Sequence, residues 1–165
     1  MTTSESRAAC ATTHFRIQQP NSKPRHIKVI GLGEGGGRIA QMIAQRGYAE
    51  VEIISNGDYE KHHAKAVVKG INDDARGLHR QLQAADIIFM VAVSGDQVDF
   101  ARVVSRVARE MGKLVTGVLI ESCSGPQTQV ASTLDTLRAS ADMLVIGSDE
   151  SYLDEMLGEL GAKVD

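Results

Sequence analysis

The sequence predicts an α/β domain with a three-layer, doubly wound fold, in which helices cover both faces of a mainly parallel sheet. Apolar runs of strand length alternate with segments whose apolar residues recur at helical spacing, from Ile27 almost to the C-terminus. The run Asp86–Val93 is apolar after its first residue, as expected of a central strand that is buried on both faces.

The first strand leads into a helix through a run of glycines. The sequence predicts a strand at Ile27–Ile30. It is followed at once by Gly31, Gly33, Gly35, Gly36 and Gly37. Glycine lets the backbone approach an anion closely, and a helix N-terminus directs free N–H groups and a positive dipole end toward it. A tight turn is the alternative explanation, but two glycines would be enough for that. We therefore predict an anion site here.

The later elements continue the alternation. Ligands of such folds bind beyond the carboxyl ends of the strands, so the loops at that edge are candidate site loops. Further strands are predicted at Val51–Ser55, Ala66–Val68, Leu114–Ile120 and Met143–Ile146. Further helices are predicted to begin near Asp73, near Phe100, at Gln127, and at Ser148 or Asp149; the last would have Leu153, Met156, Leu157 and Leu160 on its inner face.

The composition is that of a globular domain. The chain has 165 residues, of which 42% are hydrophobic and 24% charged. We expect residues 1–25, rich in Ser, Thr and Gln, to form a flexible tail and residues 26–165 to form a single domain.

The net charge of -3 argues against a general nucleic-acid or anionic-membrane surface. With no long apolar run or signal peptide, and with Cys10 and Cys123 as free thiols, we expect a cytoplasmic protein.

Several segments, in the right order, resemble FtsZ, the bacterial tubulin homologue. They include the glycine-rich first nucleotide loop of that family, its strand ending in Asn-Thr-Asp and its strand ending in Pro-Asn-Asp. The resemblance implies the tubulin/FtsZ GTPase-domain type of Rossmann-like fold, with GTP or GDP as ligand, with or without magnesium. The matching segments are Ile27–Ala40, Val51–Asp58, Ala85–Phe89, Val104–Val118 and Asp142–Asp149.

The resemblance also implies which residues line the nucleotide site. The family has Asn where this chain has Arg38, which would either bond a phosphate or be a solvated helix residue. The implied nucleotide-binding residues are Gly33, Glu34, Gly35, Gly36, Gly37, Arg38, Asn56, Asp58, Ser94 and Gly95.

The second phosphate loop departs from the family pattern. The family's Gly-Gly-Gly-Thr-Gly-Thr-Gly loop corresponds here to the shorter Val93–Asp99, which keeps only Gly95. Asp96 and Asp99 stand where phosphates would lie, and a carboxylate near a triphosphate costs on the order of a kcal/mol or more. The alternative is that Asp96 caps the helix that follows it. In either case the second half of the cradle is degraded.

Other parts of the family's machinery have no counterpart in the sequence. The loop Glu121–Pro126 has no arginine for the ribose, and the chain reaches Asp165 without the second domain that supplies the family's catalytic loop. We predict no catalytic residues, at most a weak GTPase activity, and no filament-dependent hydrolysis. Adjacent His62 and His63 would point apart, so we also predict no metal site.

Two alternatives remain open. Gly31, Gly33 and Gly36, with Asp58 after the second strand, fit the Rossmann fingerprint of an NAD-binding protein. The glycine loop would otherwise belong to a structural relic that binds no nucleotide.

Because a lone nucleotide domain exposes a surface that needs covering, we expect a homo-oligomer or a protein partner. The contact would be made through the last helix or a sheet edge, and we expect no nucleic-acid or membrane partner.

Overall fold

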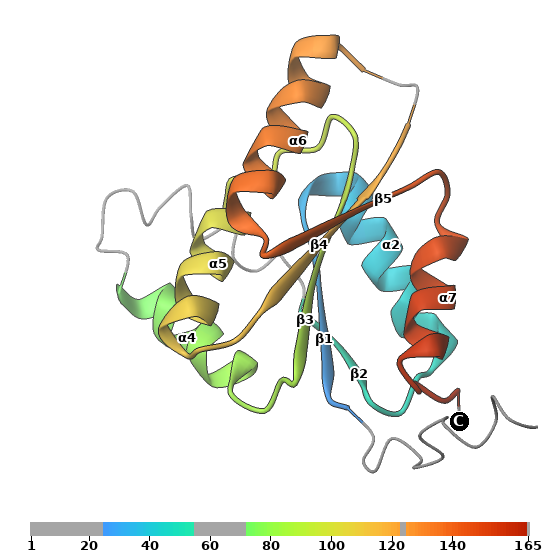
Figure 1. Ribbon diagram of the computed structural model, residues 1–165. Coiled ribbons are helices and arrows are strands. Elements are labelled where there is room, and N and C mark those ends of the chain that lie inside the picture. Colours follow the sequence, from blue (N-terminus) through green and yellow to red (C-terminus); the bar gives the residue numbers. More distant parts are fainter. Residues whose placement is uncertain (1–24, 55–71, 123–124, 165) are drawn as a thin grey trace, which may run out of the picture.

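The computed structural model describes residues 25–54, 72–122 and 125–164. Within these residues, five strands form one parallel sheet in the order β2-β1-β3-β4-β5 (Figure 1). This confirms the predicted fold class. The strands are β1 (Ile27–Gly31), β2 (Val51–Ile54), β3 (Ile87–Val93), β4 (Val115–Ile120) and β5 (Met143–Gly147).

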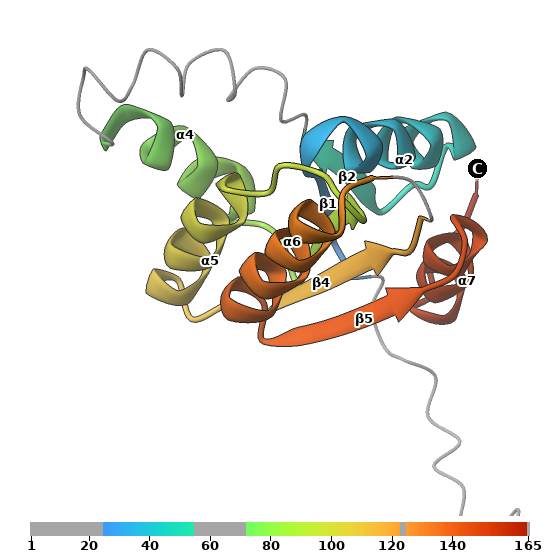
Figure 2. The same ribbon diagram turned by 90° about the horizontal axis from the view of Figure 1, so that it is seen from above.

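Helices cover both faces of the sheet (Figure 2). One layer holds α4, α5 and α6, and the opposite layer holds α2 and α7. The chain places β2 on one side of β1 and β3 on the other, so the strand order reverses at the boundary between β1 and β3, where doubly wound folds bind ligands. The helices are α2 (Gly33–Arg46), α4 (Asn72–Leu82), α5 (Phe100–Glu110), α6 (Gln127–Ser140) and α7 (Ser151–Glu159).

Each face of the sheet has its own hydrophobic core. Leu78 of α4 and Leu137 of α6 are fully buried in one core, and Ile39 of α2 and Leu153 of α7 are buried in the other. The central strand β3 contributes alternate residues to the two cores. Met90 lies in the core beneath α4, α5 and α6, whereas its neighbours Phe89 and Val91 lie in the core beneath α2 and α7. The two helical layers therefore depend on the same sheet.

The observed elements differ from the predicted ones at several boundaries. Helix α2 begins at Gly33, so most of the predicted glycine loop is helical. Leu114, predicted as the first residue of a strand, is 75% exposed because strand pairing of β4 begins with Val115 opposite Ile88. The predicted turn Asn56–Asp58 and strand Ala66–Val68 lie outside the described residues.

Candidate functional site

Helix α2 begins at the carboxyl end of β1 without a cap from its own sequence. Its N-cap residue is Leu32, whose extended backbone (φ −104°) and apolar side chain provide no hydrogen-bond acceptor for the first turn. The first four N–H groups of a helix have no partner within the helix, and they carry its positive dipole end. The start of α2 therefore needs an acceptor from elsewhere.

The acceptor is the carboxylate of Asp96, from the loop after β3. Asp96 Oδ1 accepts a hydrogen bond from the Gly35 N–H at 3.0 Å, and Oδ2 accepts one from the Gly36 N–H at 2.8 Å. Oδ2 also accepts a bond from the Val93 N–H at 2.8 Å. The position predicted for a phosphate is thus occupied by an anion of the protein itself, about 60 residues away along the chain from the helix that it caps.

The backbone of Asp96 is held as well as its side chain. The Asp96 N–H donates to the Val93 carbonyl at 3.0 Å, which closes a tight turn after β3. Thr133 of α6, 1% exposed, donates from its hydroxyl to the Asp96 carbonyl at 2.7 Å. The backbone of Asp96 is therefore held both by the end of β3 and by α6, which lies in the layer opposite α2.

Three glycines of the run are explained by this arrangement. Gly33 has φ +65°, and a Cβ there would lie 2.7 Å from the Cβ of Asp96. A Cβ at Gly35 would lie 2.6 Å from Val93 Cβ, and one at Gly36 would lie 2.1 Å from the Val91 carbonyl oxygen. The close approach of α2 to β3 and Asp96 is therefore sufficient to explain why these three positions are glycine, and no bound ligand is needed for the explanation.

Gly37 has no such explanation. A Cβ there would meet nothing within 4 Å. Its neighbour Arg38 is exposed, as is Glu34 in the first turn. If a phosphate approaches α2, the space over Gly37 and the guanidinium of Arg38 are what the described residues offer it.

The remaining predicted site residues lie in two places. Ser94, 8% exposed, donates its N–H to the Ile120 carbonyl at 2.9 Å, and Gly95 follows with φ +93°. The structure thus brings Ser94 and Gly95 to the same edge as Gly33–Arg38, through the turn that carries Asp96. Asn56 and Asp58 lie outside the described residues, so their place in the site stays a prediction.

The alternative in which Asp96 caps the following helix is wrong. The N-cap residue of α5 is Asp99, which makes no side-chain cap hydrogen bond, and Asp96 caps α2 instead. Sequence reasoning missed this partner because it looks for caps next to the helix that they serve. The available signal was Leu32, which cannot cap, combined with an acidic residue after the strand beside β1.

A second acidic residue at this edge, Asp149, supplies an acceptor to the start of the last helix, although the N-cap residue of α7 is Glu150 and not the predicted Ser148 or Asp149. Asp149 Oδ1 accepts the Ser151 N–H at 2.8 Å and also the Ser151 hydroxyl. These hydrogen bonds from Ser151 lower the pKa of the exposed Asp149 carboxyl below its usual value. Two helix starts at the same edge, those of α2 and α7, are therefore both supplied with a carboxylate.

Neither a metal-binding cluster nor a membrane-spanning helix is found in the described part of the chain. It contains no group of three or more His, Cys, Asp or Glu residues that could hold a metal ion. Among the helices of residues 25–54, 72–122 and 125–164, none combines the length and hydropathy that crossing a bilayer requires.

No protein-family model matches the chain. Among solved structures, an empty FtsZ dimer from M. jannaschii aligns with a TM-score of 0.56 and 15% identity, over 87% of this chain and 49% of that chain. A mutant of M. jannaschii FtsZ aligns equally well, over 86% and 50%. The likeness establishes an FtsZ-like fold, and this chain spans about half the length of those FtsZ chains.

A pilus assembly-related protein from Burkholderia pseudomallei aligns over its whole length and 89% of this chain, with 17% identity. Its TM-score is 0.43, which is too low to support a conclusion.

Proposed function

We propose that this chain is an FtsZ-like domain that folds without a bound nucleotide, binds guanine nucleotide weakly and acts through protein contacts. The observation that carries the proposal is the Asp96 carboxylate, which accepts hydrogen bonds from Gly35 and Gly36 at the start of α2. A domain with an internal anion in this position does not need a phosphate to satisfy that helix.

A phosphate at the same N–H groups would have to displace Asp96. Hydrogen bonds to a charged group contribute about 1.5–3 kcal/mol each, so the lost bonds to Gly35 and Gly36 cost a phosphate several kcal/mol. Each 1.4 kcal/mol or so of that cost weakens binding about tenfold. A phosphate beside the retained carboxylate would instead meet a charge of the same sign.

A weak nucleotide site remains compatible with the same geometry. Gly37 leaves open space in the second turn of α2, and the exposed Arg38 supplies a positive charge there. The comparisons point to FtsZ folds and give no support to the NAD alternative. Guanine nucleotide is therefore the ligand class to test first, with at most a weak GTPase activity.

The first test measures the nucleotide content and affinity of the purified chain. We expect no co-purified nucleotide on chromatography of the denatured protein, and calorimetric dissociation constants for GDP and GTP with magnesium of about 1 mM or weaker. Asp96→Ser removes the carboxylate and leaves room for a phosphate, so it should tighten guanine nucleotide binding at least about tenfold. Asp99→Ser is the matched control, because the exposed Asp99 makes no cap hydrogen bond.

Three outcomes would contradict the proposal. Stoichiometric GDP or GTP in the purified wild-type chain would show that the nucleotide is a resident ligand. Micromolar affinity of the wild-type chain for a guanine nucleotide would show that Asp96 does not compete with it. Tighter binding of NADH than of GTP would favour the dinucleotide class instead.

A further inference from the structure

Two helices in opposite layers carry opposite charge. Helix α5 has three arginines and one glutamate, whereas α7 has three acidic residues and no basic one. The net charge of the whole chain is only -3, so this contrast reflects where the charges lie and not the overall composition. Figure 2 shows the two helices on opposite sides of the sheet. Helices α5 and α7 therefore present surfaces of opposite charge.

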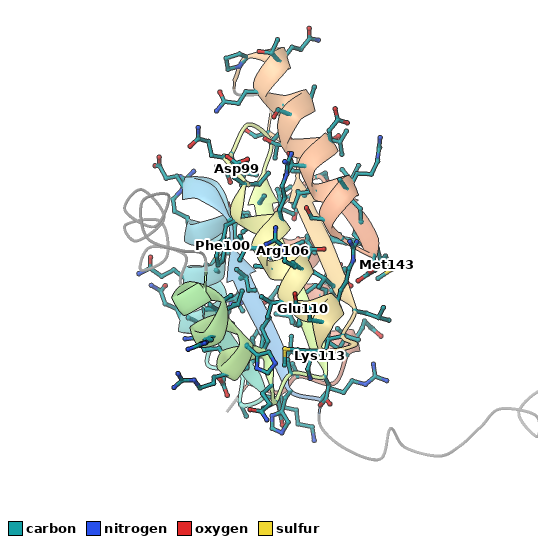
Figure 3. The ribbon with its side chains drawn as sticks, turned by 90° about the vertical axis from the view of Figure 1, so that its left-hand side faces the viewer. Asp99, Phe100, Arg106, Glu110, Lys113 and Met143 are labelled. Atoms are coloured by element: carbon teal, nitrogen blue, oxygen red, sulfur yellow. The ribbon has the colours of Figure 1, made fainter. Side chains whose placement is uncertain are left out.

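The basic surface is a stripe of arginines along a groove. Arg102, Arg106 and Arg109 are all exposed, and their spacing of four and then three residues keeps them on one side of α5. They line a groove of about 450 Å³ between α5 and α6, together with Ser105, Glu110, Ala139 and Ser140. Figure 3 shows Arg106 and Glu110 on α5.

The charge of this groove is mostly uncompensated. Its three arginines face one carboxylate from within the groove, that of Glu110. Arg109 Nε also lies 4.0 Å from Asp142 Oδ1, which is a loose ion pair. Within the described residues, Arg102 and Arg106 make no ion pair. The groove is thus suited to an anionic partner, with Arg102 and Arg106 as its main charges.

The acidic surface is a stripe with the same spacing in the reverse order. Tyr152, Glu155 and Glu159 are exposed and follow one another at three and then four residues along α7. Leu153 and Leu157 are fully buried beneath them, so this stripe faces away from the core. Within the described part of the chain, neither glutamate has an ion-pair partner.

We propose that α7 of one copy of this chain docks antiparallel along the α5–α6 groove of a second copy. In that register Glu159 meets Arg102, Glu155 meets Arg106, and Tyr152 lies against Arg109. The first two contacts are ion pairs, and the third places a guanidinium on an aromatic face. The proposal rests on the proposed function, because it names the partner for the protein contacts inferred there.

The position of the two surfaces determines the kind of assembly. Because α5 and α7 lie in opposite layers, each copy would use its basic groove for one neighbour and its acidic helix for another. Such heterologous contacts do not close into a two-fold dimer; they produce rings or open filaments. A second copy supplies negative charges for the arginines of the groove without any other anionic molecule, because the same chain carries the acidic helix α7.

The test is sedimentation of the full chain at several protein concentrations, in about 0.1 M and about 1 M sodium chloride, where charges are screened beyond about 10 Å and about 3 Å. We expect concentration-dependent association at the lower salt, weakened at least about tenfold at the higher salt. Reversing either stripe, with Arg102→Glu and Arg106→Glu or with Glu155→Arg and Glu159→Arg, should abolish self-association.

Restoration by the second reversal separates this contact from a general effect of charge. An equimolar mixture of the two reversed variants should associate again, since each then offers a surface complementary to the other. The chain that carries all four substitutions should also recover self-association. Arg76→Glu with Arg80→Glu on α4 is the matched control, because it reverses an exposed pair of the same spacing outside the groove.

The proposal is overturned if the wild-type chain stays monomeric at low salt and several hundred micromolar, or if folded reversed variants associate as the wild type does. It is also overturned if the mixture does not restore association. Circular dichroism melts confirm the fold of each variant. None of these results depends on nucleotide, so a resident GDP would overturn the proposed function and leave this contact standing.

Discussion

Asp96 stabilises the start of α2 from a distant part of the chain. Helix N-termini are usually capped by a Ser, Thr, Asp or Asn at the N-cap position, where this chain has Leu32. The carboxylate of Asp96 supplies the missing acceptors and places a negative charge at the positive end of the helix dipole. A single side chain thus joins the turn after β3 to α2.

Removing this carboxylate should destabilise the fold. Asp96→Ala leaves the N–H groups of Gly35, Gly36 and Val93 without their acceptor, and should lower the free energy of unfolding by about 2–4 kcal/mol. Urea denaturation followed by circular dichroism measures the change. Asp99→Ala should stay within about 0.5 kcal/mol of the wild type; an equal loss in both variants would remove the special role of Asp96.

Adjacent glycines of α2 should respond in opposite directions to alanine. Gly36→Ala places a Cβ 2.1 Å from the Val91 carbonyl oxygen, so the helix must move away from the sheet at a cost of about 1–3 kcal/mol or more. Gly37→Ala meets nothing within 4 Å and should stabilise the helix by about 0.5–1 kcal/mol. Thermal melts of both variants measure the difference, and destabilisation by Gly37→Ala would contradict this explanation.

At the scale of elements, the last helix is tied to the end of α2 by a small polar cluster. The Tyr48 hydroxyl donates to Asp154 Oδ1 at 2.7 Å, and Arg46 Nε lies 3.7 Å from the same oxygen. Asp154 belongs to α7, whereas Arg46 and Tyr48 lie at and just beyond the end of α2. The cluster therefore joins two helices of the same layer through side chains at their ends.

This cluster predicts a dependence of stability on alkaline pH. The hydrogen bond to Asp154 is the main cause that raises the pKa of Tyr48 above its ordinary value. Because the folded state holds this proton more tightly than the unfolded chain does, the stabilisation is complete below about pH 10, the ordinary pKa of tyrosine, and is lost as pH rises through the higher folded pKa.

Tyr48→Phe should therefore lower the free energy of unfolding by about 0.5–1.5 kcal/mol at neutral pH, with a smaller difference from the wild type at strongly alkaline pH. Urea titrations at several pH values measure both effects. Tyr152→Phe is the control, because Tyr152 is an exposed tyrosine on the outer side of α7. A difference between Tyr48→Phe and the wild type that persists unchanged at high pH would exclude this linkage.

At the scale of the whole molecule, one sheet supports two cores and separates two charged surfaces. The strands β1, β3 and β4 contribute residues to the cores on both faces, so neither helical layer has an independent core. The same separation puts α5, which carries the arginine stripe, and α7, which carries the acidic stripe, in opposite helical layers. The salt-dependent association proposed above follows from this placement and from no single residue.

Much of this fold follows from local patterns in the sequence. Apolar runs of strand length that alternate with helical patterns predict the doubly wound sheet, and Leu153 and Leu157, predicted on the inner face of the last helix, are indeed buried. Burial of one face of a helix or both faces of a strand is visible in the sequence because it constrains residues that are neighbours along the chain.

The role of Asp96 as the acceptor for the start of α2 was decided by the tertiary structure. The sequence predicts an anion at the glycine run, and the structure places the carboxylate of Asp96 there, because the parallel pairing of β1 and β3 brings the turn after β3 beside the glycines. This contact joins residues about 60 positions apart, and a periodic pattern carries no information about which distant segments meet. Local periodicity determines the elements, whereas the order of the strands determines which side chain reaches a helix end.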